Sequence, residues 1–162
     1  MANDVSHVWS ATRRDRRTTP EAAMAATAGT TRTPNATRTV LRRAAWLALA
    51  LFWSAFAVLE GIGHGWLAGA AALAFLVLPD LTFLVALDDA PRMAKGQLPP
   101  RAVPYYNAMH RALVPLALLV ACTVLPVTWP PAVAALCGWL AHISYDRAFG
   151  YGLRTKEGFQ RD

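Results

Sequence analysis

Four long apolar segments dominate the chain after residue 43 and constrain its fold more than any other feature. They cover residues 44–59, 67–87, 105–127 and 130–151. A helix needs about 20 predominantly apolar residues to cross the hydrocarbon core of a bilayer, and 55% of the chain is hydrophobic. We therefore predict an all-α fold, a four-helix integral membrane bundle over residues 44–162, with the lipid bilayer as its main partner.

Residues 1–43 have a different composition, rich in Thr, Ala and Arg and poor in large apolar side chains. A segment of this kind cannot bury enough apolar surface to offset the entropy of ordering. We predict that it is a disordered, basic N-terminal tail in the cytoplasm.

The basic residues are segregated along the chain, and this segregation predicts the membrane topology. All 16 lysines and arginines lie in the tail, in the connection over residues 88–111 or at the C-terminal end, and none lies in the loops at 60–66 and 128–129. Because cytoplasmic loops carry the excess of Lys and Arg, we expect an inner-membrane protein with both termini in the cytoplasm. The net charge of +6 then favours anionic lipid on the cytoplasmic side as a partner, and not nucleic acid.

Small residues predict close helix packing. Gly61, Gly65 and Gly69 recur every four residues, a spacing that lets membrane helices approach closely and that also occurs in helix dimers. A homodimer is therefore one expectation. Cys122 and Cys137 lie inside apolar segments without a C-x-x-C spacing, so we expect small buried side chains.

A few polar side chains interrupt the apolar segments. With a rise of about 1.5 Å per residue, Asp80, His110, His142 and Asp146 all fall about 8 to 13 Å from the predicted cytoplasmic ends of their helices. His142 and Asp146 also share one face of a helix, four residues apart. An ionisable side chain at such depth is costly and needs a partner or a role. Further polar residues near the same membrane surface are Asn107, Arg147, Tyr106 and Tyr151.

Three interpretations of this cluster are open. As a site for a divalent metal, two imidazoles and two carboxylates suit zinc, manganese or iron, and three of them would leave a position for water or substrate. As a proton or ion relay, the histidines would pass charge between the carboxylates. As a structural network, Asp80 or Asp146 would pair with Arg147, while Asn107 and His110 would bridge helices.

Several motifs resemble those of a known family. They are Pro79-Asp80-Leu81, Y-N-A-M-H ending at His110 with Pro115 after it, A-H-I-S-Y-D-R-A-F-G-Y-G-L over 141–153, and Gly158-Phe159. Over residues 42–162 the chain is similar to a bacterial integral membrane family catalogued as domain of unknown function 4260, a resemblance that implies a membrane location but no particular activity. Members often carry Arg-x-Glu-Gly where the first helix begins, whereas this chain reads L-R-R-A-A-W.

The sequence thus predicts a small multi-pass inner-membrane protein whose His/Asp cluster is structural or binds a partner. The alternative is a membrane-embedded, metal-dependent hydrolase that acts on a lipid-like substrate. A short similarity supports this alternative, because a Pro-Asp pair in one membrane helix and a His-Arg pair soon after resemble membrane-bound metal-dependent hydrolases. No nucleophile-elbow, Walker, Rossmann or H-E-x-x-H pattern occurs, so those chemistries have no support.

Overall fold

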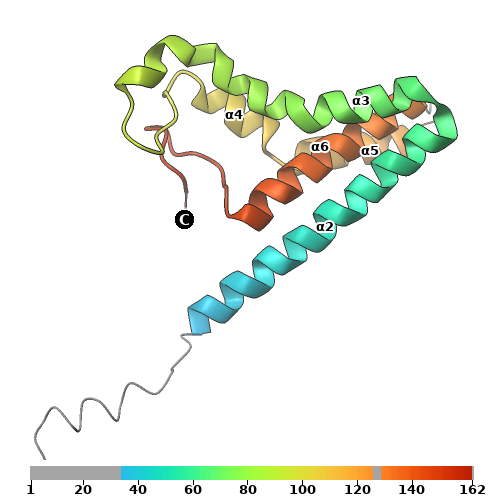
Figure 1. Ribbon diagram of the computed structural model, residues 1–162, viewed down its shortest axis with the longest axis horizontal. Helices are drawn as coiled ribbons and strands as arrows, with labels where there is room; N and C mark the ends of the chain where they lie inside the picture. The colour runs from blue at the N-terminus through green and yellow to red at the C-terminus, as the bar shows by residue number, and fades with distance from the viewer. Residues whose placement is uncertain (1–33, 126–128, 162) are drawn as a thin grey trace, which may run out of the picture. The chain divides into compact units, whose positions relative to one another are not determined.

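The described part of the chain is helical. The computed structural model describes residues 34–125 and 129–161, and no β-strand occurs among them. The elements in chain order are α2 (Pro34–His64), α3 (Trp66–Val77), the 3-10 segment η1 (Leu78–Arg92), α4 (Val103–Met109), α5 (Leu113–Val124) and α6 (Pro130–Phe149) (Figure 1). The prediction of an all-α fold is confirmed for these residues.

The first helix is longer than the apolar segment that predicted it. It begins at Pro34 and not at residue 44, so residues 34–43 belong to a helix and not to the predicted tail. Extending an existing helix fixes one residue per hydrogen bond gained, and Ala, Arg and Leu all favour helix. The rest of the predicted tail, residues 1–33, lies outside the described residues.

The second apolar segment is not one helix. α3 ends at Val77, and η1 continues with a kink at Ala86, where φ is −138° and ψ is 39°. Pro79 explains the change, because it has no N–H to donate to the carbonyl four residues earlier. Asp80 therefore lies near the junction between an α-helix and a 3-10 segment.

The third apolar segment is broken as well. α4 and α5 are separated at residues 110–112, and their axes differ by 41°. The ring of Pro115 would clash with the carbonyl of Arg111 in a continuous helix, which accounts for the break. His110 ends α4 at this bend.

α6 is the most buried helix of the described residues. Its buried stretch includes every residue from Ala134 to Ser144, and it packs against α3 and α5 (Figure 1). The contact with α3 is close, because a Cβ at Gly138 would overlap the carbonyl of Ala72. The indole Nε1 of Trp139 donates to the carbonyl of Met109 at 2.6 Å.

The outer helices carry the apolar surface expected of a membrane protein. Two stretches, Ala36–His64 and Trp66–Arg92, are long and apolar enough to cross a bilayer, and α4 with α5 makes a third if the bent pair is one span. α6 is not among these stretches. Two or three candidate spans are therefore seen by length and composition, fewer than the four predicted.

Candidate metal centre

Four side chains from three parts of the fold meet at one point. Asp80 comes from η1, His110 from the bend between α4 and α5, and His142 and Asp146 from successive turns of α6. The distances from His110 Nε2 are 3.2 Å to His142 Nε2, 3.3 Å to Asp146 Oδ2 and 3.9 Å to Asp80 Oδ1. From His142 Nε2, the corresponding distances are 3.6 Å to Asp80 Oδ1 and 3.8 Å to Asp146 Oδ2.

The other ring nitrogen of each imidazole is occupied by the backbone. His110 Nδ1 lies 2.8 Å from the carbonyl of Tyr106, and His142 Nδ1 lies 2.8 Å from the carbonyl of Leu76. A carbonyl oxygen can only accept a hydrogen bond, so each Nδ1 must carry a proton and donate. In a neutral imidazole this leaves a lone pair on Nε2.

The centre of the cluster is therefore lined by acceptor atoms. Two Nε2 lone pairs and two carboxylates face one another at short distances, so these groups repel one another. A cation at the centre relieves this repulsion, and it can be a metal ion or a proton on an imidazole.

The spacing is close to that of a metal site. Zinc binds His nitrogen and carboxylate oxygen at about 2.0 to 2.2 Å, so ligand atoms in a tetrahedral shell lie about 3.3 to 3.6 Å apart. The five separations given above run from 3.2 to 3.9 Å. The ligand atoms of Asp80, His110 and His142 all lie within 4.8 Å of one another.

The cluster opens on its carboxylate side. The side chains of His110 and His142 are 2% and 8% exposed, whereas those of Asp80 and Asp146 are 51% and 22% exposed. A small ligand or water can therefore approach past Asp80 without any rearrangement of the imidazoles.

Two predicted supporting residues touch His110. The ring of Tyr106 stacks on the imidazole with centroids 3.8 Å apart, and Tyr106 also provides the carbonyl that accepts from Nδ1. Arg147 Nη2 donates to the carbonyl of His110 at 3.2 Å. Contrary to the structural interpretation, no ion pair joins this arginine to Asp80 or Asp146 in the described residues.

The other two supporting residues lie outside the cluster. Asn107 holds the C-terminal segment, since its amide donates to the carbonyl of Arg154 at 2.9 Å and its oxygen accepts from the Arg154 N–H at 2.7 Å. The side chain of Tyr151 is exposed. The backbone carbonyl of Tyr151, and not its side chain, accepts a hydrogen bond from Arg147. Neither residue contacts the four central side chains.

The carbonyl of Leu76 is a partner of His142 that is absent from the predicted set of residues. Backbone acceptors have no residue signature, but Pro79 three residues later gave an indirect signal. A helix that changes type leaves carbonyls near its end without their usual intrahelical partners. The carbonyl of Leu76 is one of them, and it accepts the hydrogen bond from His142 Nδ1.

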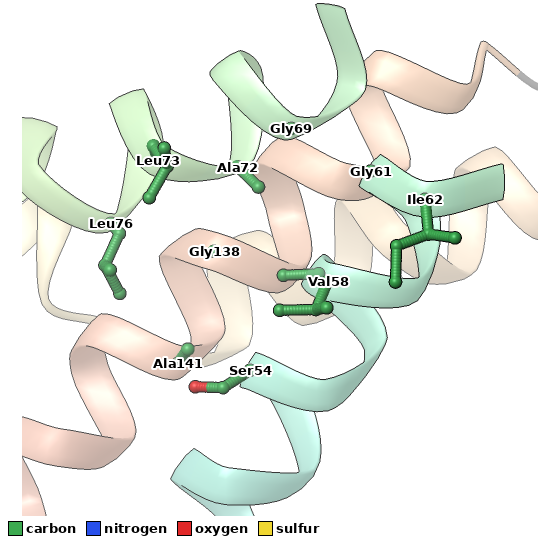
Figure 2. Close-up of a pocket in the computed structure, with 11 residues that line it drawn as sticks. Ser54, Val58, Gly61, Ile62, Gly69, Ala72, Leu73, Leu76, Gly138 and Ala141 are labelled. Atoms are coloured by element: carbon green, nitrogen blue, oxygen red, sulfur yellow. The ribbon is translucent and has the colours of Figure 1, made fainter. Parts of the chain in front are cut away.

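An apolar pocket of about 350 Å³ lies beside the cluster. Figure 2 shows it between α2, α3 and α6, with Ser54 as the only polar side chain among the labelled residues. Leu76 lines this pocket, while its carbonyl accepts from His142. The pocket and the candidate metal centre are thus neighbours.

The comparisons with known proteins identify a family for this chain but no activity. No curated protein and no solved structure matches the chain at a significant level. One family model matches residues 38–162, which is more than half of the chain, and its description is domain of unknown function (DUF4260). On this match, the chain belongs to the DUF4260 family.

Proposed function

We propose that this protein binds a divalent metal ion through Asp80, His110 and His142, with Asp146 as the fourth ligand or as a base beside it. The observation that carries the proposal is the pair of Nε2 atoms 3.2 Å apart, each imidazole donating its Nδ1 proton to a backbone carbonyl. Donation from the second nitrogen to a carbonyl is the usual way in which proteins orient metal-binding histidines. The half-exposed carboxylate of Asp80 leaves the site accessible.

The chemistry that best fits such a site is hydrolysis. A bound ion of this class supplies Lewis acidity and an acidified water. The chain orients both imidazoles, excludes water on their buried side and leaves the carboxylate side open. Asp146 would take a proton from the attacking water and return it to the leaving alcohol oxygen as the ester bond breaks. The adjoining apolar pocket favours a substrate with a hydrophobic portion, so we propose a lipid-like ester.

The membrane arrangement that we propose has four spans, with α6 as the fourth. α6 is shielded by its neighbours and need not present an apolar surface to lipid. The segregation of Lys and Arg supports both termini in the cytoplasm and an inner-membrane location. On this topology, the candidate metal centre lies in the cytoplasmic leaflet.

A second candidate function has one supporting observation. His110 Nε2 and Asp146 Oδ2 are 3.3 Å apart, which also suits an imidazolium paired with a carboxylate. The cluster would then hold a proton and fix helix register, or relay charge, without any metal. Such a protein would be structural or would bind a partner.

A hydrolysis assay distinguishes the two functions. The full-length protein is purified in detergent, and ester and phosphoester lipid probes are tested with and without a chelator. We expect turnover that the chelator removes and added zinc or manganese restores, with Asp80→Asn slowing it about a hundredfold or more. The matched variant Asp88→Asn makes the same change at an exposed carboxylate outside the cluster and should keep most of the rate. Turnover that is indifferent to chelator and to Asp80→Asn would contradict the proposal.

A further inference from the structure

A second cavity, of about 460 Å³, lies where the start of α2 meets the end of α6. Its lining includes four arginines and no acidic residue. They are Arg42, Arg43, Arg147 and Arg161. Within residues 36–125 and 129–161, none of the four forms an ion pair with a carboxylate. Four guanidinium groups around one space repel one another unless an anion lies between them.

The end of α6 is shaped to admit these side chains. Gly150 has φ of 94° and ends the helix, with the Tyr151 N–H donating to the carbonyl of Asp146 at 2.7 Å. A Cβ at Gly150 would overlap the guanidinium of Arg43. Arg147 is held from two sides, since it donates to the carbonyls of His110 and Tyr151 at 3.2 and 3.3 Å. The approach of Arg43 to Gly150 thus joins the two helices at the cavity, and the two hydrogen bonds of Arg147 fix its guanidinium there.

The cavity adjoins the candidate metal centre. Arg147 follows Asp146 in the chain, and the carbonyl to which it donates belongs to His110. An anion bound by the arginines would therefore be linked to the metal centre through Arg147, since none of the four central side chains lines the cavity itself. Guanidinium groups bind phosphate oxygens through paired, charge-assisted hydrogen bonds.

The line along which α2 faces α6, here called the seam, runs from the basic cavity to the apolar pocket, which α3 also lines. From Arg43 to Ser54 the helix rises by about 16 Å, and Ser54 Oγ lies 3.3 Å from the Tyr145 hydroxyl of α6. Beyond Ser54 the seam is lined by Val58 and Ile62 in the apolar pocket (Figure 2). The basic cavity and the apolar pocket thus follow one another along α2 in the same order as the phosphate headgroup and the hydrocarbon chain of a lipid.

We infer that the arginine cavity binds the phosphate group of a membrane lipid, with the lipid chain lying along the seam between α2 and α6. This inference rests on the proposed function, because it names a phosphate-bearing lipid as the substrate class of the metal centre. Inorganic phosphate or a soluble phosphate ester shares the same headgroup chemistry but lacks the chain that would fill the apolar pocket.

Native mass spectrometry of the full-length protein tests the inference. The protein is equilibrated in mixed micelles of phosphatidylcholine with a small fraction of phosphatidic acid, and bound phosphatidic acid is counted. We expect the double variant Arg42→Gln/Arg43→Gln to bind phosphatidic acid at least about tenfold more weakly, since charge-assisted hydrogen bonds are lost. Inorganic phosphate and glycerol phosphate should compete poorly, and competition as strong as that of the lipid would overturn the assignment to a lipid.

The matched control is Arg92→Gln/Arg101→Gln. It makes the same change in charge on the same predicted membrane side, but these arginines lie beside Asp89, at 3.7 Å in each pair. Phosphatidic acid binding should stay within about twofold of the unaltered protein. An equal loss in both double variants would show general attraction to a basic surface and would overturn the inference.

Metal content separates this inference from the proposed function. The Arg42→Gln/Arg43→Gln protein should keep its metal, whereas His142→Ala should lose the metal and keep the lipid. Arginine-dependent lipid binding in a protein that never holds metal would support the lipid site and overturn its role as a substrate site. Metal without arginine-dependent lipid binding would overturn the inference and leave the proposed function standing.

Discussion

Each imidazole of the cluster owes its orientation to one backbone carbonyl. Because the carbonyls of Tyr106 and Leu76 take the Nδ1 protons, both Nε2 atoms turn toward the carboxylates. The ring of Tyr106 is stacked on the His110 imidazole and also limits the rotation of that imidazole. Because both imidazoles are held in this orientation, their Nε2 lone pairs are already placed to bind a cation.

Tyr106 offers a test of that preorganisation. Tyr106→Leu removes the stacked ring, so we expect metal affinity to fall about tenfold, as for other outer partners of metal ligands. Tyr106→Phe keeps the ring and loses only a hydroxyl 3.4 Å from the carbonyl of Gly152, and should bind metal almost as well as the unaltered protein. Competition with a chromophoric chelator measures both affinities. Equal affinity in all three proteins would show that the ring does not orient His110.

Part of the site could be predicted from residues alone. The i, i+4 spacing of His142 and Asp146 and the shared depth of Asp80 and His110 both follow from helix geometry, and the structure brings these four side chains together. Their role as metal ligands stays a prediction. The Leu76 carbonyl could not be predicted, because it depends on where α3 stops and on which helix packs against it.

At the element scale, the site depends on how closely α3 and α6 approach. Gly138 has no side chain to separate α6 from the carbonyl of Ala72, and the same two helices carry Leu76 and His142. The breaks at Pro79 and before Pro115 then place Asp80 and His110 against α6. The prolines predicted kinks, but the lengths of η1 and α4 depend on tertiary packing that no local pattern encodes.

Gly138→Ala tests this helix contact. The added methyl has no space, so we expect a loss of about 1 to 3 kcal/mol in the free energy of unfolding and weaker metal binding as His142 shifts. Thermal unfolding in detergent, followed by circular dichroism, measures the stability.

Gly63→Ala is the matched control, since a Cβ at Gly63 meets nothing within 4 Å. Replacing glycine by alanine inside a helix should leave stability unchanged or raise it by up to about 1 kcal/mol. If both variants unfold alike, the α3–α6 approach is not a determinant of stability.

At the scale of the whole molecule, the topology decides which compartment the site faces. α2 and the stretch from α3 through η1 have the length and composition of spans, whereas α6 is buried among the other helices and carries the site. The polar residues of the cluster lower the mean hydropathy of α6, and α6 is not among the candidate spans. Gly61 and Gly69 face each other within one chain, since a Cβ at Gly61 would lie 3.2 Å from the Gly69 Cα, so this glycine face serves packing inside the protein. A homodimer stays a prediction.

Labelling of single cysteines tests the four-span topology. In a background with Cys122 and Cys137 replaced by alanine, Trp66→Cys and Trp129→Cys should react with an impermeant maleimide in intact spheroplasts. Lys95→Cys and Lys156→Cys should react only after lysis, because positive-inside topology places them in the cytoplasm. Labelling of positions 129 and 156 from the same side would show that α6 does not cross the membrane.

The central claim is that the cation among Asp80, His110, His142 and Asp146 is a metal ion. The most direct test is elemental analysis of full-length protein purified in detergent without chelator and without a histidine tag, beside His142→Ala and Asn107→Ala. We predict near-stoichiometric divalent metal in the unaltered protein and in Asn107→Ala, and its loss in a folded His142→Ala protein. Metal at background levels in all three proteins, with His142→Ala merely less stable, would contradict the account and leave the cluster as a protonated network between helices.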